Sequence, residues 1–208
     1  MHYHYPTKTW TNRRRLAEHQ PNKNHYDFTN TYPDVRSLLL AIGLHGEGLV
    51  GIEVGMYRAE SFCAILQCCR NVSKLYGVDM WEEYVDHIGG GAMKKDYKTA
   101  ELNRLVAEHY IKHSGESERA EVLEMHCSDA AELFSDETFD FIFLDAYISE
   151  DDVVRDLEEW YPKLKKGGLF AGHDFHAKEV RGPVLQFYEK KSPKRSMVYY
   201  DSTWAWIK

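Results

Sequence analysis

The stretch GIEVGMYRAESF, residues 51–62, decides the fold prediction. Its apolar first half is typical of a buried β-strand, and Glu53 places a carboxylate near the end of that strand. Gly55 follows, and three larger residues then lead to the small Ala59 and to Ser61. A strand that ends in a charge and passes through a narrow loop into a helix is typical of a ligand site at the edge of an open α/β sheet.

The same alternation continues along the chain. Short apolar runs alternate with longer amphipathic segments, which predicts strands joined by crossover helices in a doubly wound, mostly parallel sheet. The last run, SMVYYDSTWAWIK (196–208), contains two strand-like stretches around DST and predicts an antiparallel hairpin at the sheet edge. The predicted parallel strands lie in GLVGIEVG (48–55), KLYGVDM (74–80), AEVLEMHC (120–127), FDFIFLDA (139–146) and GGLFAGHDF (167–175).

Composition narrows the class of protein. A chain of 208 residues is long enough for one domain with a sizeable core. A net charge of −7 disfavours nucleic-acid and anionic-membrane partners. Four cysteines without CxxC spacing are typical of reduced thiols, and with no apolar run long enough for a membrane span or signal peptide we predict a cytoplasmic protein. We expect residues 1–32 to form an N-terminal arm and residues 33–208 to form the domain.

The ends of the second and third strands carry further polar groups. Asp79 suits a ribose diol, because one carboxylate can accept hydrogen bonds from both hydroxyls. Met80 and Trp81 follow it and offer apolar surface to a flat base. Ser128 and Asp129, after the third strand, could bind an adenine. A ligand with a ribose, a purine and a charged tail would use all of these groups.

Five motifs in order carry a family resemblance: EVGMYRAES, GVDMW, SDAAELF, FDFIFLDAY and LKKGGLFAGHDF. They resemble the motifs of class I S-adenosylmethionine-dependent methyltransferases, and most of all the small-molecule O-methyltransferase branch that includes sugar and macrolide enzymes. The resemblance implies a Rossmann-like, doubly wound sheet of seven mostly parallel strands, with the last strand inserted antiparallel. Many members have further glycines where this chain has Tyr57 and Ala59.

The resemblance also implies a role for individual residues. Glu53 and Gly55 would line the methionine part of S-adenosylmethionine, and Asp79 would bind the ribose. The expected cofactor-binding residues are Glu53, Gly55, Met56, Tyr57, Ala59, Ser61, Asp79, Met80, Trp81, Ser128, Asp129 and Ala130.

The chemistry is expected at the ends of the fourth and fifth strands. Asp145 and Asp174 there would suit a divalent cation such as Mg²⁺, which would lower the pKa of an acceptor hydroxyl. This resembles the metal-dependent O-methyltransferases, although His173 stands where that group usually has an acid. Without metal, His173 is the expected general base, since its ordinary pKa is near neutrality, and we predict that Asp145 and His173 are catalytic.

We therefore predict methyl transfer from S-adenosylmethionine to a small-molecule hydroxyl. The motif around Asp145 lacks the prolines common in base N-methyltransferases, which argues against nucleic acid as the acceptor. Two alternatives stay open: a non-catalytic S-adenosylmethionine-binding or scaffold protein, and a nucleotide-dependent dehydrogenase. The glycine-rich loop HIGGGAMKKDY (87–97) is expected to be a substrate lid, and a homo-oligomer is left open.

Overall fold

The computed structural model describes residues 26–29, 35–86, 93–95, 97–191, 196–200 and 202–208. Two predictions therefore lie largely outside the described residues. These are the N-terminal arm over residues 1–32 and the glycine-rich part of the loop that was expected to form a lid. Of the arm, only residues 26–29 are described, and Phe28 packs its ring against Tyr110 with a centroid distance of 5.0 Å.

The five predicted apolar runs form parallel strands, and the last two stretches form the predicted hairpin. The seven-stranded sheet has the order β5-β2-β1-β6-β7-β9-β8. Strand β9 pairs antiparallel with both β7 and β8, so the terminal strand is inserted into the sheet as predicted. The strands are β1 (Leu49–Val54), β2 (Val72–Asp79), β5 (Ala120–Glu124), β6 (Phe139–Leu144), β7 (Leu164–Gly172), β8 (Val198–Tyr200) and β9 (Thr203–Ile207).

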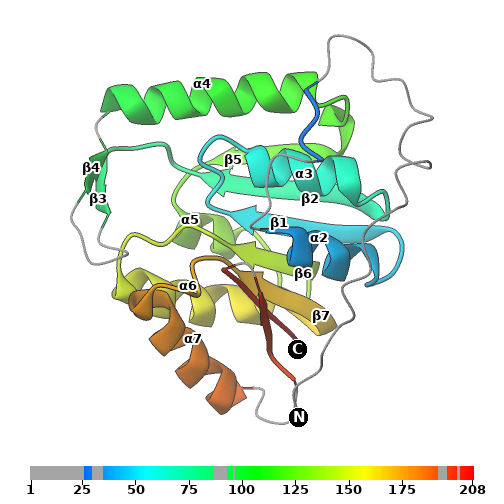
Figure 1. Cartoon of the computed structure of the whole chain (residues 1–208), viewed down its shortest axis with the longest axis vertical. Helices are drawn as coiled ribbons and strands as arrows, with labels where there is room; N and C mark the ends of the chain where they lie inside the picture. Colours follow the sequence, from blue (N-terminus) through cyan, green and yellow to red (C-terminus); the bar gives the residue numbers. More distant parts are fainter. Residues whose placement is uncertain (1–25, 30–34, 87–92, 96, 192–195, 201) are drawn as a thin grey trace.

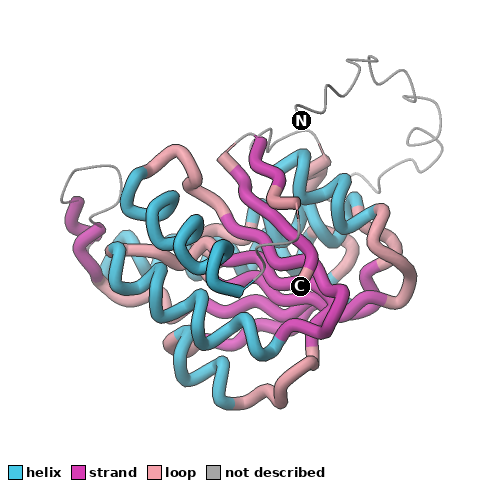
Figure 2. The backbone as a smooth tube through the Cα atoms, turned by 90° about the horizontal axis from the view of Figure 1, so that it is seen from below, coloured by secondary structure: helices cyan, strands magenta, loops and turns pink. Residues whose placement is uncertain are grey.

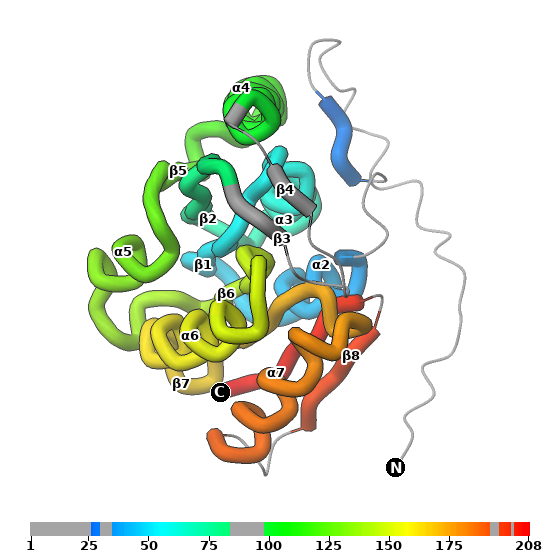
Figure 3. The backbone as a smooth tube through the Cα atoms, turned by 90° about the vertical axis from the view of Figure 1, so that its left-hand side faces the viewer, coloured from blue at the N-terminus to red at the C-terminus, as the bar shows by residue number. Residues whose placement is uncertain are grey.

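Helices cover both faces of this sheet (Figures 1 and 2). Figure 3 shows α2 and α3 on one side of the strands and α5, α6 and α7 on the other. The short strands β3 (Tyr84–Asp86) and β4 (Met93–Lys95) form a separate antiparallel pair. The helices are α2 (Arg36–Gly43), α3 (Glu60–Cys68), α4 (Tyr97–His113), α5 (Cys127–Glu132), α6 (Glu150–Trp160) and α7 (Lys178–Lys191), with 3₁₀ turns at Ser117–Arg119 and Tyr161–Lys163.

Side-chain alternation along the strands fills two hydrophobic cores. Phe141 and Phe143 of β6 belong to the core under α2 and α3, whereas Ile142 and Leu144 belong to the core under α5, α6 and α7. Because successive side chains of a strand point to opposite faces, an apolar run with no alternation is the pattern of a strand buried on both sides. The predicted doubly wound α/β fold is confirmed.

The inserted strand β9 is held by aromatic packing. Trp204 and Trp206 are buried, and their rings stack with centroids 5.0 Å apart. Both rings also contact Phe170 of β7. These contacts fix the hairpin beside β7, and the turn of the hairpin then lies next to the residues that follow β7.

Candidate active site

A row of backbone hydrogen bonds joins the segments that leave the carboxyl ends of the strands. Gly55 donates to Val78 of β2, Asp145 donates to Val54 of β1, and His173 donates to Leu144 of β6, with N···O distances of 2.7–3.0 Å. Phe175 then donates to Ser202 in the hairpin turn at 2.9 Å. These bonds bring the ends of β1, β2, β6 and β7, which carry predicted site residues, and the hairpin turn together along one edge of the sheet.

Glu53 is completely buried, although it carries a carboxyl group. Its Oε1 accepts a hydrogen bond of 2.5 Å from the Ser61 hydroxyl, while its Oε2 has no partner among the described residues. Burial raises the pKa of Glu53 well above its usual value, the bond from Ser61 opposes this, and Asp145 and Asp79 raise it further. Glu53 therefore presents an unsatisfied oxygen that would gain from a cationic or hydrogen-bond-donating ligand.

Gly55 is required by a contact within the protein. Its φ is +90°, and a Cβ there would lie 2.4 Å from the Asp145 carbonyl oxygen. The glycine thus lets the loop after β1 cross closely over the loop after β6. The next side chain, Met56, is buried and lies over Gly77, so only the backbone of Met56 faces the edge of the sheet.

Asp79 organises the loop that follows β1. Its Oδ2 accepts the backbone N–H groups of Met56 and Tyr57 at 2.9 and 2.8 Å, and its Oδ1 accepts that of Trp81 at 2.9 Å. Burial raises the pKa of Asp79, and these backbone bonds oppose that shift. A carboxylate has about four lone-pair sites, so the loop occupies most of its acceptor capacity.

Two residues of this loop adopt an unusual backbone conformation. Tyr57 and Ala59 have φ values of +49° and +60°. They stand at the two positions where the sequence departs from a glycine-rich motif, and glycine would enter this left-handed region at no steric cost. Ala59 is buried as the N-cap of α3, whereas the Tyr57 side chain is 43% exposed.

Trp81 and Met80 lie beside this loop. The indole of Trp81 is buried, and its Nε1 donates a 2.7 Å hydrogen bond to the Tyr57 carbonyl. Met80 is half-buried. Trp81 therefore links the loops after β1 and β2 and also supplies an aromatic wall next to them.

The predicted adenine-binding segment forms the beginning of α5. His126 is the N-cap, and its Nδ1 accepts the backbone N–H of Ser128 at 3.1 Å. Ser128 is half-buried, Asp129 is exposed and Ala130 is buried. Sequence reasoning missed His126, because histidine is an uncommon N-cap and only the position before the helix indicates this role.

Asp145, His173 and Asp174 come together at the ends of β6 and β7. His173 Nδ1 lies 3.4 Å from Asp145 Oδ1 and 3.3 Å from Asp174 Oδ1. One ligand atom from each of these residues lies within 4.8 Å of the others, which is a geometry that could hold a metal ion. Nε2 of His173 is buried with no partner among the described residues.

The charges of this cluster alter the expected protonation. Burial lowers the pKa of His173, but hydrogen bonds and charges from both aspartates outweigh it and raise that pKa to about 10. Burial raises the pKa of Asp145, partly offset by His173, whereas His173 keeps the pKa of Asp174 below its usual value. An imidazole that holds its proton at neutral pH is a poor general base, contrary to our reasoning from its ordinary pKa.

Sequence reasoning also missed a buried group beside the cluster. Tyr147 is 7% exposed, and its hydroxyl has no partner among the described residues. Burial raises the pKa of Tyr147, and the charges of Asp156, Asp145 and Asp174 raise it further. The sequence places Tyr147 two residues after Asp145, and this proximity was the one available signal.

The fold and the site define a class I S-adenosylmethionine-dependent methyltransferase. The strand order with its inserted antiparallel strand is the architecture of that class. Residues 52–175 match the family described as "Methyltransferase domain". This match covers more than half of the chain, so the chain belongs to that family.

Solved structures show the same fold at low sequence identity. A protein from Klebsiella pneumoniae described as an O-methyltransferase is 16% identical with a TM-score of 0.58, over 88% of this chain and 82% of that one. A protein from Staphylococcus aureus described as a caffeoyl-CoA O-methyltransferase is 16% identical with a TM-score of 0.57, over 83% and 81%. A protein from Clostridium thermocellum described as an rRNA methylase is 10% identical with a TM-score of 0.58, over 82% and 90%.

These three similarities concern the fold alone, and their acceptors range from a small molecule to RNA as described. No curated protein matches this sequence. Within the described residues, no helix is both long and apolar enough to span a membrane.

Proposed function

We propose that this protein transfers the methyl group of S-adenosylmethionine to the hydroxyl of a small molecule. The observation that carries the proposal is the convergence of Asp145, His173 and Asp174 beside the buried Glu53. The charge of Asp145 helps to raise the pKa of Glu53, which reflects how close the two carboxyl groups lie. Proton-accepting groups are thus next to the residues proposed for the methionine part of the cofactor.

The proposed cofactor site follows the edge of the sheet. Glu53 and Ser61 bind the methionine end, where the free Oε2 of Glu53 accepts a hydrogen bond from the cofactor's ammonium group. The loop from Gly55 to Ala59, including the backbone of Met56 and Tyr57, borders the ribose. Asp79 offers its remaining acceptor site to a ribose hydroxyl. Met80, Trp81, Ser128, Asp129 and Ala130 form the proposed adenine site.

The reaction itself asks little of the protein beyond positioning, because the sulfonium group already activates the methyl. The acceptor oxygen attacks the methyl carbon in line, the C–S bond breaks, and S-adenosylhomocysteine leaves with the bonding electrons on sulfur. Asp145 receives the hydroxyl proton in this scheme, since its raised pKa makes it a stronger base than an ordinary carboxylate. His173 holds the aspartate side chains in place.

The same three residues fit a divalent cation. Two carboxylate oxygens and one imidazole nitrogen lie close enough to share one ion, which would take the place of the proton that His173 otherwise holds. Such an ion would lower the pKa of the acceptor hydroxyl. Carboxylates suit Mg²⁺, but an imidazole ligand is better suited to Mn²⁺, Fe²⁺ or Zn²⁺. We therefore propose that any metal held by Asp145, His173 and Asp174 belongs to the latter group rather than being the Mg²⁺ first expected.

The proposal is tested by calorimetry with S-adenosylhomocysteine, followed by methyl transfer from radiolabelled S-adenosylmethionine to a panel of small hydroxyl compounds. Asp145→Asn should abolish transfer and leave S-adenosylhomocysteine affinity within a few-fold of the original. Asp151→Asn, a change of the same kind at an exposed site on α6, is the control and should alter neither.

Two results would count against the proposal. Normal transfer by Asp145→Asn would remove that residue from the chemistry. Cofactor binding with no transfer to any hydroxyl compound, with or without added Mn²⁺, would favour the non-catalytic alternative.

A further inference from the structure

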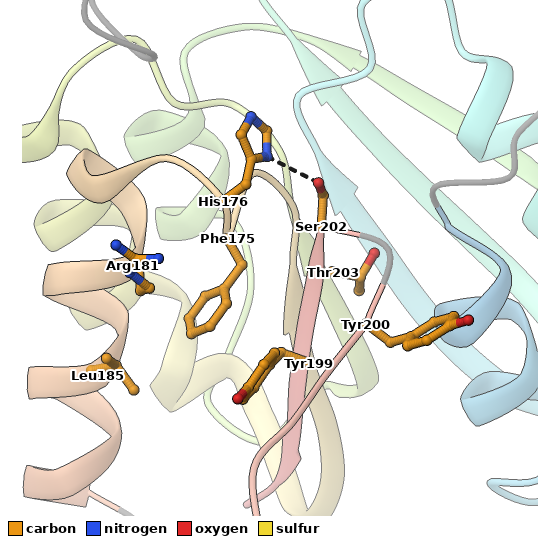
Figure 4. A pocket seen from close by; sticks show the side chains of 8 residues that line it. All are labelled: Phe175, His176, Arg181, Leu185, Tyr199, Tyr200, Ser202 and Thr203. Carbon is orange, nitrogen blue, oxygen red and sulfur yellow. Dashed lines mark hydrogen bonds between the residues drawn. The ribbon is translucent and has the colours of Figure 1, made fainter. Parts of the chain in front are cut away.

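A pocket of about 440 Å³ lies between α7 and the β8–β9 hairpin (Figure 4). This volume is in the range of small-molecule sites, which is about 300–1,000 Å³. Its lining comes from the segment after β7, from α7 and from the hairpin. The lining residues are Phe175, His176, Arg181, Leu185, Tyr199, Tyr200, Ser202 and Thr203.

One wall of the pocket is aromatic and apolar, and it is open to solvent, since Tyr199 and Leu185 are both exposed. Phe175 and Tyr199 contact each other with ring centroids 5.2 Å apart and planes inclined by 32°, and Leu185 lies opposite them on α7. Tyr200, the next residue of β8, points the other way, toward α2 (Figure 4). A planar ring would find contact surface on Phe175, Tyr199 and Leu185.

One side chain gives the pocket a charge. Arg181, in the first turns of α7, is exposed and forms none of the ion pairs found among the described residues. No carboxylate is among the pocket-lining residues that the structure describes. A guanidinium group that forms no ion pair with a described residue, beside an apolar wall, suits a ligand that carries a carboxylate, which the group can bind through two parallel hydrogen bonds.

The pocket adjoins the proposed catalytic cluster. His176 Nδ1 pairs with the Ser202 hydroxyl at 2.9 Å and lies 4.0 Å from Asp174 Oδ1. The bond between His176 and Ser202 therefore forms the boundary between the pocket and the carboxylates at the ends of β6 and β7. A ligand in the pocket would have its polar edge within reach of that boundary.

We propose that this pocket binds the methyl acceptor and that the acceptor is a hydroxylated aromatic carboxylic acid. The ring packs on Phe175 and Tyr199, the carboxylate pairs with Arg181, and the hydroxyl lies toward the carboxylates at the ends of β6 and β7. This inference rests on the proposed function, which supplies the reaction, but the pocket supplies the class of acceptor. Because the net charge of −7 disfavours anions over the surface as a whole, the binding of an anion here depends on Arg181.

The test is calorimetry on the whole chain saturated with S-adenosylhomocysteine, with 3- and 4-hydroxybenzoate as probes. The matched neutral probes are 3- and 4-hydroxybenzyl alcohol. We expect at least one acid to bind at least tenfold more tightly than its alcohol. Arg181→Met should remove that preference and leave the alcohol unaffected, whereas Lys178→Met, a similar change on the same helix, should preserve the preference.

Two further measurements keep the outcome decisive. Tyr199→Ala should weaken acid and alcohol alike, because it removes the aromatic wall without removing the charge. A transfer assay should methylate hydroxylated aromatic acids in preference to neutral phenols.

The inference is overturned if neither acid binds at 10 mM, if Arg181→Met binds the acids normally, or if neutral phenols alone are methylated. Each of these results leaves the proposed function standing when S-adenosylhomocysteine still binds. Failure of S-adenosylhomocysteine to bind would instead contradict the proposed function itself.

Discussion

Asp79→Asn separates the structural and cofactor-binding contributions of the carboxylate at the end of β2. The wild-type side chain accepts backbone N–H groups of Met56 and Tyr57 on Oδ2 and of Trp81 on Oδ1. Asparagine has one acceptor oxygen. If that oxygen takes the place of Oδ2, two of the three bonds persist and the amide NH₂ opposes the N–H of Trp81.

The magnitudes follow from that count. Losing one hydrogen bond to a charged acceptor costs about 1.5–3 kcal/mol. Removing the charge offsets part of this, because burial raises the pKa of Asp79 and so disfavours its ionised form. We expect the free energy of unfolding of the empty protein to change by less than about 2 kcal/mol. The ribose loses its charged acceptor, so S-adenosylhomocysteine should bind about 10–100-fold more weakly.

Calorimetry measures the affinity, and urea unfolding followed by circular dichroism measures the stability. Glu82→Gln is the control, since this exposed carboxylate lies three residues further along the same segment and should affect neither quantity. Unchanged affinity in Asp79→Asn would refute the ribose contact. A large loss of stability with normal affinity would show that Asp79 serves the loop alone.

Three other predictions test the strain and the buried charges. Ala59→Gly should relieve a left-handed backbone strain of about 1–2 kcal/mol, but it also loses a buried methyl group and backbone rigidity, so the free energy of unfolding measured in urea should hardly change. Ala64→Gly, inside α3, relieves no strain and should lower the free energy of unfolding by about 1.5–2 kcal/mol. Equal losses of stability in the two variants would contradict the strain at Ala59. Burial raises the pKa of Asp156 to about 6, so the folded protein binds a proton that the unfolded chain has lost, and the free energy of unfolding should fall by up to about 3 kcal/mol as pH rises from about 4 to about 6. Asp156→Asn should flatten this pH profile, as measured by urea unfolding. The same pH profile in Asp156→Asn as in the original protein would contradict the raised pKa. The pKa of His173 is raised to about 10, so its imidazole should titrate near pH 10 by NMR, and the stability that protonated His173 gives the fold should be lost as pH rises from about 6.5 to 10. Asp145→Asn should lower the titration midpoint of His173. A midpoint near 6.5 in the original protein would contradict the ion pairs.

The sequence predicted the sheet because the central strands β1 and β6 are buried on both faces and each parallel strand ends at, or directly before, a polar residue or glycine. That pattern places Glu53, Asp79 and Asp145 at one edge without knowledge of any contact. The sequence could not predict which loops approach each other closely. The need for Gly55 comes from the Asp145 carbonyl ninety residues away, and the burial of Met56 depends on the space over Gly77.

The protonation state of His173 could not be predicted from the sequence either. Its ordinary pKa suggested a general base, but that value applies to an imidazole in water. Two carboxylates, one from the end of β6 and one adjacent in the chain, stabilise the protonated form through contacts that exist only in the folded protein. A residue type can be predicted from a motif, whereas its charge state depends on the segments that the fold brings beside it.

The buried acids explain why the edge of this sheet is suited to a cationic cofactor. Glu53 is fully buried with one oxygen unpaired, and Asp79 and Asp145 both have raised pKa values caused first by burial. Each of these groups costs the empty protein stability, because burying a carboxyl group without full compensation is unfavourable. S-adenosylmethionine carries a sulfonium and an ammonium group, and either charge would favour the ionised carboxylates. The buried acids already destabilise the protein without its ligand, so any interaction that stabilises them in the complex adds directly to the free energy of binding. The same acids that weaken the fold would therefore favour a positively charged ligand.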